Sequence, residues 1–169
     1  AETARRGRQA IVLVPEIALT PQTVDRFVAR FPGQVGLIHS KLSAGERYDT
    51  WRQARAGSLN VIIGPRSALF APLQNLGLII ADECHDASYH QAEPPFYDAV
   101  ATAEAYARIC GGLCILGSAT PTVVQRYRAE TGTSIRLELR PRIASESVTQ
   151  PPPELALPKV QIVDLRQEL

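Results

Sequence analysis

The sequence lacks the features that would place it outside the ordinary globular proteins. No apolar run approaches the roughly 20 residues that a membrane-spanning helix needs. Hydrophobic content of 45% with balanced charge excludes an intrinsically disordered chain. The formal net charge is only +1, so composition gives no bulk attraction for nucleic acid, and any such contact must come from local patches. The 169 residues are enough for one domain with a core of its own.

Cysteine is also scarce, since the chain has only Cys84, Cys110 and Cys114. An odd number of cysteines without a recognisable secretory signal is typical of a reducing cytosol, so we expect a cytoplasmic protein. These cysteines, with a histidine, could form a zinc site, but Cys114 falls inside an apolar strand pattern. We therefore interpret the three as buried thiols and not as metal ligands.

Five short apolar runs rich in Val, Ile and Leu predict strands that are buried on both faces, as in a parallel sheet covered by helices. The runs are Ala10–Val14, Val35–Ile38, Asn60–Ile63, Leu78–Ala81 and Leu113–Leu116. Helices are expected between or after them at Pro21–Phe31, Ala44–Ala56, Asp98–Ile109 and Thr122–Glu130. This alternation predicts an α/β fold with a doubly wound, mainly parallel sheet and helices on both faces.

Helix start signals and composition set the expected boundaries. Thr20 followed by Pro21 marks one helix start, and Ser43 with Glu46 forms a capping box at the next. We expect residues 1–149 to form one α/β lobe. The proline-rich residues 150–158 predict an extended linker, and residues 159–169 an edge strand or a lead into a following domain.

The chemically most suggestive segment is Asp82-Glu83-Cys84-His85, which directly follows the apolar run Leu78–Ala81. A buried strand that ends in two adjacent carboxylates is the arrangement with which P-loop motor proteins hold magnesium and activate water. In that arrangement Asp82 helps to bind the metal and Glu83 polarises the attacking water. We interpret His85 as a hydrogen-bond partner that links nucleotide states, and not as a metal ligand.

Polar or small residues follow the other predicted strands as well, and the carboxyl ends of parallel strands meet at one edge of a sheet. Ser118 and Thr120, in the Gly117–Pro121 segment, can bond a neighbouring carboxylate and shift with nucleotide state. Arg66 and Ser67 suit a phosphate contact on a nucleic-acid backbone. The alternatives are a capped tight turn for the former and a solvated ion pair for Arg66.

An aromatic-bearing segment follows the acidic pair. It contains Tyr89, His90, Phe96 and Tyr97. Exposed rings stack on nucleic-acid bases, whereas a packed lid over the site is the alternative interpretation of the same residues.

Several longer strings resemble the motifs of the primosomal replication-restart helicase family. The strings, in family order, are Leu13–Gln22, Gly64–Leu73, Asn75–Tyr89, Gly117–Pro121 and Val160–Leu169. The resemblance spans nearly the whole chain. It implies a RecA-like first lobe of a superfamily-2 DNA helicase, a P-loop NTPase lobe that uses ATP and magnesium.

The resemblance also implies roles for individual residues. Glu83 and Asp82 would be the catalytic carboxylates, with Asp82 and His85 on the nucleotide side and Asp82 toward magnesium. Ser118 and Thr120 would couple hydrolysis to DNA. The single-strand path would run along Pro15, Thr20, Gln22, Arg66 and Ser67.

The implied biology is that of a bacterial, nucleoid-associated helicase. Family members act on single-stranded and forked DNA at stalled forks, move 3′ to 5′, and reload the replicative helicase with primosomal proteins and single-strand-binding protein. Zinc belongs to the family outside this segment, and no membrane partner is expected.

The chain departs from the family pattern at Cys84, Pro65 and His90, and the usual basic residues after Tyr89 are missing. No Gly-x-x-x-x-Gly-Lys-Ser/Thr phosphate-binding string occurs in the 169 residues. We therefore expect a helicase fragment that is inactive alone. The alternative is a degenerate module that binds DNA or a partner without catalysis, and an in-frame phosphate loop upstream of Ala1 in the gene would exclude it.

Overall fold

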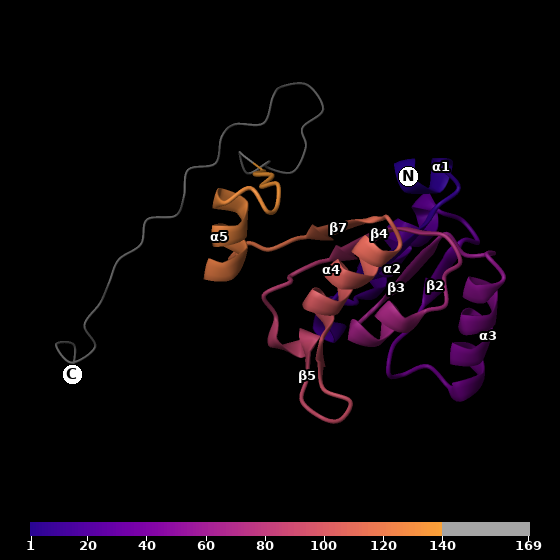
Figure 1. The fold of residues 1–169 in the computed structure, drawn as a ribbon. Helices are drawn as coiled ribbons and strands as arrows, with labels where there is room; N and C mark the ends of the chain where they lie inside the picture. Colours follow the sequence, from indigo (N-terminus) through magenta and orange to yellow (C-terminus); the bar gives the residue numbers. More distant parts are fainter. Residues whose placement is uncertain (140–169) are drawn as a thin grey trace, which may run out of the picture. The chain divides into compact units, whose positions relative to one another are not determined.

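The computed structural model describes residues 1–139, and the linker and edge strand expected at 150–169 lie outside this range. The chain divides into two compact units, Ala1–Val123 and Val124 onward. Figure 1 shows the first unit as a sheet with helices packed on it. Each unit is described by itself.

The first unit is built on a five-stranded parallel sheet in the order β2-β3-β1-β4-β7. Its strands are β1 (Gln9–Leu13), β2 (Val35–Leu37), β3 (Val61–Gly64), β4 (Leu76–Ala81) and β7 (Leu113–Leu116). All five predicted strands are confirmed, within two residues at each end. β1 lies at the centre, where it pairs with β3 from Ala10↔Val61 to Leu13↔Gly64 and with β4 on its other side.

Helices connect the strands and cover both faces of the sheet centre. They are α1 (Glu2–Arg5), α2 (Pro21–Arg30), α3 (Ala44–Arg55) and α4 (Ala99–Ile109). On one face, alanines of α4 and Ala54 of α3 join a core with Ile11, Leu13, Ile62 and Ile79. On the other face, Phe27 and Phe31 of α2 pack on Val12, Val61 and their neighbours. The predicted RecA-like doubly wound α/β class is confirmed.

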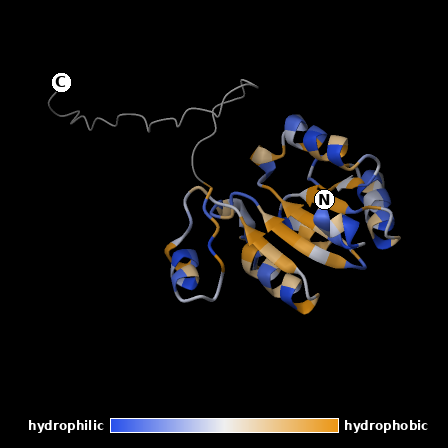
Figure 2. Cartoon of the chain, turned by 90° about the horizontal axis from the view of Figure 1, so that it is seen from above, coloured by the Kyte–Doolittle hydropathy of each residue, from blue (hydrophilic) through white to orange (hydrophobic). Residues whose placement is uncertain are grey.

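Burial follows strand position in the sheet. Every residue of β1 and β3 is buried, as the continuous apolar runs predict. The edge strand β7 departs from that expectation, because Leu113 is 70% and Ile115 46% exposed. No helix of the first unit covers that side of β7 within the described residues. Figure 2 shows the hydrophobic strands between helices whose outer faces are mixed or polar.

The predicted helix starts are confirmed at atomic level. The Thr20 side chain accepts a bond from the Thr23 amide at the start of α2. At α3, the Glu46 carboxylate accepts from the Ser43 amide at 2.8 Å, and the Glu46 amide donates to the Ser43 hydroxyl at 3.3 Å. Both orphan donors of the first turn are satisfied by local residues, which is why sequence alone locates this boundary.

Short elements that the sequence pattern did not predict lie in the loops. Residues 1–139 contain three 3-10 helices, η1 (Glu16–Ala18), η2 (Arg66–Phe70) and η3 (Ala87–Tyr89). The aromatic-bearing segment is a small antiparallel hairpin of β5 (His90–Gln91) and β6 (Tyr97–Asp98). Its strands are two residues long, too short to produce a readable alternation of polar and apolar residues.

The second unit contains α5 (Val123–Glu130), which begins one residue after the predicted start, with an ion pair between Arg126 and Glu130 at 2.6 Å. Among the helices of residues 1–139, none has the length and apolar character to span a bilayer.

Candidate functional site

The polar residues singled out in the sequence lie where β1, β3, β4 and β7 end. Backbone hydrogen bonds tie these ends together: the Asp82 amide donates to the Leu13 carbonyl at 2.9 Å, and the Val14 amide donates to the Gly64 carbonyl at 3.0 Å. Because the strands are parallel, segments far apart in sequence reach the same edge. This carboxyl edge is the candidate site.

The acidic pair occupies a strained turn at the end of β4. Glu83 has a φ of 46°, in the left-handed region that residues with a Cβ rarely adopt. The Asp82 carboxylate accepts the Glu83 amide at 3.0 Å, and the Asp86 amide closes the turn on the Glu83 carbonyl at 2.8 Å. The turn presents both carboxylates at the surface, because Asp82 is exposed and Glu83 half-buried.

The Gly117 loop is fastened to this turn by two backbone bonds. The Gly117 amide donates to the Ala81 carbonyl at 2.8 Å, and the Cys84 amide donates to the Gly117 carbonyl at 2.9 Å. A Cβ at position 117 would lie 3.2 Å from the Asp82 carboxylate oxygen, so glycine lets the loop approach closely. The acidic turn and the Gly117 loop are therefore in direct contact.

Side chains join the same two segments. The His85 ring nitrogen Nδ1 lies 2.8 Å from the Ser118 hydroxyl and 3.5 Å from a Glu83 carboxylate oxygen. The Thr120 amide also donates to the Ser118 hydroxyl, at 3.0 Å. The structure thus brings together His85, Ser118 and Thr120 beside Glu83, and their expected role in coupling hydrolysis to DNA stays a prediction.

Tyr89 supports the acidic turn from the interior of the first unit. Its side chain is 1% exposed, and its hydroxyl donates to the main-chain carbonyl of Asp82 at 2.6 Å. Burial, followed by the nearby Asp82 carboxylate, raises the pKa of the Tyr89 phenol far above its usual value. The hydroxyl therefore remains a donor. The sequence suggested an exposed ring or a lid for Tyr89. No local signal in the sequence marks Tyr89 as a buried residue that holds the acidic turn.

The rest of the aromatic-bearing segment is divided. Phe96, directly before β6, is 71% exposed, whereas Tyr97 is half-buried with its ring edge-to-face on Phe70, the centroids being 5.2 Å apart. His90 pairs with Asp98 across the hairpin at 3.0 Å. The segment thus has both packed and exposed rings, and the stacking of its exposed ring on nucleic-acid bases stays a prediction.

The residues predicted to contact DNA are placed unequally. Thr20, Gln22 and Ser67 are exposed on loops or first turns at or near the carboxyl edge. Pro15 is among the fully buried side chains, so its ring offers no surface to a nucleic acid. Arg66 is half-buried, and its guanidinium donates to the carbonyls of Ser88 at 2.6 Å and His90 at 3.1 Å.

The donor set suits a magnesium ion that arrives with phosphates. Mg²⁺ usually takes one or two protein carboxylates, keeps waters and completes its shell with substrate oxygens. The exposed Asp82 carboxylate can supply one of them. In the described part of the chain no group of three or more His, Cys, Asp and Glu side chains is arranged to hold a metal by itself. No disulfide joins the three cysteines, all of which lie in the described range; Cys84 is buried and the other two are half-buried.

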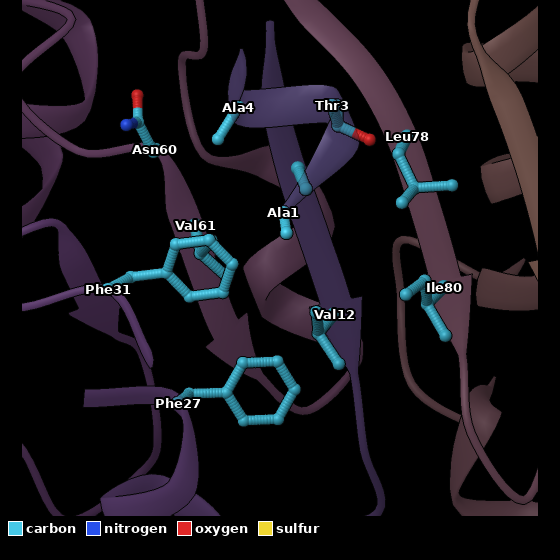
Figure 3. A pocket seen from close by; sticks show the side chains of 11 residues that line it. Ala1, Thr3, Ala4, Val12, Phe27, Phe31, Asn60, Val61, Leu78 and Ile80 are labelled. Atoms are coloured by element: carbon cyan, nitrogen blue, oxygen red, sulfur yellow. The ribbon is translucent and has the colours of Figure 1, made fainter. Parts of the chain in front are cut away.

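An apolar hollow of the first unit lies away from the acidic pair. Figure 3 shows it between α1, β1 and β4, with the rings of Phe27 and Phe31 on one side and Val12, Leu78 and Ile80 on the other. Its lining is apolar except for Thr3 and Asn60, and no carboxylate enters it. It lacks the groups that hydrolysis needs, so the candidate site remains the carboxyl edge.

Comparison with known proteins agrees with the observed fold. Residues 2–127 match the model of the family described as DEAD/DEAH box helicase, and the chain belongs to this family. In the solved structures, the C-terminal domain of S. cerevisiae Dbp5 bound to Gle1 superposes with a TM-score of 0.50 at 15% identity, covering 77% of this chain and 75% of that one. That likeness supports the fold alone.

Comparison with individual sequences shows which helicases this chain is similar to. The chain is 45% identical over 164 residues to replication restart protein PriA of Bacillus subtilis, covering 97% of this chain and 19% of that protein. It is 47% identical over 170 residues to PriA of Synechocystis sp., again with 97% and 19% coverage. The chain thus spans about a fifth of the length of these relatives. The resemblance of its motifs to replication-restart helicases is confirmed.

Proposed function

We propose that this chain is the segment of an ATP-dependent DNA helicase that carries the acidic hydrolysis motif, in a protein that restarts replication. The observation that carries the proposal is the Asp82–Glu83 turn at the end of the sheet, fastened to the Gly117–Thr120 loop by two backbone bonds. Similarity to the PriA proteins supports the biological setting.

The proposed roles follow from position. Glu83 is the carboxylate that polarises the attacking water, and Asp82 helps to hold magnesium. Magnesium, when bound with the nucleotide, neutralises charge on the phosphates. His85 lies on the nucleotide side and, with Ser118 and Thr120, transmits the state of the acidic turn to the loop. The exposed Thr20, Gln22 and Ser67 lie along the proposed single-strand path.

The wider role is proposed from the relatives. It comprises 3′-to-5′ movement on single-stranded and forked DNA, assembly with primosomal proteins and single-strand-binding protein, and a bacterial cytoplasmic location. The segment alone is proposed to be inactive, because its sequence has no lysine-containing phosphate loop.

The test is Glu83→Gln in the full-length protein that contains this segment. The amide keeps the shape of the side chain but removes the charge that polarises water, so we expect DNA-stimulated ATP hydrolysis to fall by about 10²–10⁴-fold while DNA affinity is unchanged. Asp49→Asn, an exposed acid on α3, is the matched control and should keep wild-type turnover. Retained turnover in Glu83→Gln would refute the assignment of the carboxylate.

A further inference from the structure

Arg66 makes contacts that a nucleic-acid-binding arginine does not need. One nitrogen, Nη1, donates to two main-chain carbonyls, those of Ser88 and His90. Both carbonyls belong to the segment after the acidic turn. Arg66 therefore fastens η2, which follows β3, to the base of the β5–β6 hairpin.

The two carbonyls held by Arg66 flank Tyr89 in the chain. Tyr89 is buried, and its hydroxyl reaches the Asp82 carbonyl at 2.6 Å. Arg66 is thus hydrogen-bonded to the main chain on both sides of Tyr89, and the Tyr89 side chain is hydrogen-bonded to Asp82. Contact between the Phe70 and Tyr97 rings reinforces the link between η2 and the hairpin.

We propose that Arg66 is a positioning residue, which holds Tyr89 in place and through it sets the acidic turn, instead of holding the nucleic-acid backbone. The inference rests on the proposed function, and it reassigns Arg66 from the role expected from the sequence. Arg66 thereby links η2 rigidly to the acidic turn. A nucleic-acid strand that contacts the neighbouring Ser67 then changes the position of Asp82 through Arg66.

The chemistry of arginine separates the two roles. A guanidinium bonds several acceptors in one plane, whereas a lysine ammonium is a compact point charge. Arg66→Lys therefore keeps an attraction for phosphate, but its shorter side chain does not carry a nitrogen to the position of Nη1 between the two carbonyls. Arg66→Gln loses both the charge and the Nη1 donor.

The main experiment measures DNA-stimulated ATP hydrolysis by the full-length protein with Arg66→Lys and Arg66→Gln. We expect both variants to lower kcat by about tenfold or more, because a small misplacement of a catalytic group is costly, and to leave the KM for DNA within about twofold. Arg47→Lys, an exposed arginine on α3, is the control and should match wild type. A rise in KM for DNA with Arg66→Gln that Arg66→Lys rescues would show a phosphate contact and overturn the proposal.

A second variant tests the path without touching Arg66. Tyr89→Phe removes the hydroxyl that reaches Asp82 and should lower kcat in the same way, again with little change in KM for DNA. Wild-type turnover in a folded Tyr89→Phe protein would overturn the proposal.

Hydrogen exchange on this chain gives a readout that is independent of turnover. Arg66→Lys should speed amide hydrogen exchange in the peptide 82–90, whereas Arg47→Lys should not. Unchanged exchange in Arg66→Lys would overturn the proposal that Arg66 holds this segment, whatever the kinetics show. If the wild-type full-length protein shows no DNA-stimulated hydrolysis, the proposed function fails, and the exchange result still decides whether Arg66 positions the acidic turn.

Discussion

Replacing Tyr89 by phenylalanine should destabilise this chain measurably, although it removes a single oxygen. The ring is 1% exposed and stays in place, so no cavity forms, and the loss is confined to the 2.6 Å bond to the Asp82 carbonyl. A net hydrogen bond contributes about 0.5–1.5 kcal/mol, and the Asp82 carbonyl, which is only part-buried in this bond, costs toward the low end of about 1–3 kcal/mol when it loses its donor. We expect the free energy of unfolding to fall by about 1.5 kcal/mol.

Urea denaturation of the 169-residue chain, followed by circular dichroism, measures this change. With a denaturant slope of about 2 kcal/mol per molar, the midpoint should fall by about 0.7 M. Tyr48→Phe is the matched control, because Tyr48 is 62% exposed on α3 and its hydroxyl meets water. If the two variants differ by less than about 0.3 kcal/mol, the hydroxyl of Tyr89 does not support the acidic turn.

Three further predictions concern the chain by itself. Burial, then the nearby Glu104 carboxylate, raises the pKa of the Cys114 thiol to about 12. The pKa of this thiol is therefore higher in the folded chain than in the unfolded chain. The contribution of the neutral thiol to stability is complete below about pH 8.5 and is lost as the pH rises toward 12. Cys114→Ala should therefore lose less stability than wild type between about pH 8 and pH 10.5 in urea titrations, and equal losses would contradict this. Gly64→Ala would place a Cβ 2.0 Å from the Ile38 carbonyl oxygen, so a loss of at least about 2 kcal/mol is expected in the same assay, with exposed Gly45→Ala as control. Calorimetry of this chain with ATP and magnesium should give a dissociation constant weaker than about millimolar, because no phosphate loop is present in its sequence, and micromolar binding would refute that reasoning.

Much of the fold follows from local sequence. The β1 and β3 runs are apolar throughout because both faces of the sheet centre are covered, and the caps at Thr20 and Ser43 satisfy amides within three residues. The carboxylates of Asp82 and Glu83 could be placed at the site because they follow a buried strand directly, and parallel strands end at one edge. Each of these inferences uses neighbours in the chain or a fixed period.

What the sequence by itself determined is the α/β class, the five strands of the main sheet with the four longer helices, and the acidic pair at the end of β4. Only the tertiary structure decided how that pair is held: Gly117 against Asp82, Ser118 on His85, Tyr89 beneath the Asp82 carbonyl and Arg66 on the carbonyls around Tyr89. The physical reason is that most of these contacts join residues more than twenty positions apart, and a side chain's hydrogen-bonding capacity does not specify its partner. An arginine at position 66 can bind a phosphate or a pair of carbonyls equally well, and the packing of η2 against the hairpin selects the carbonyls.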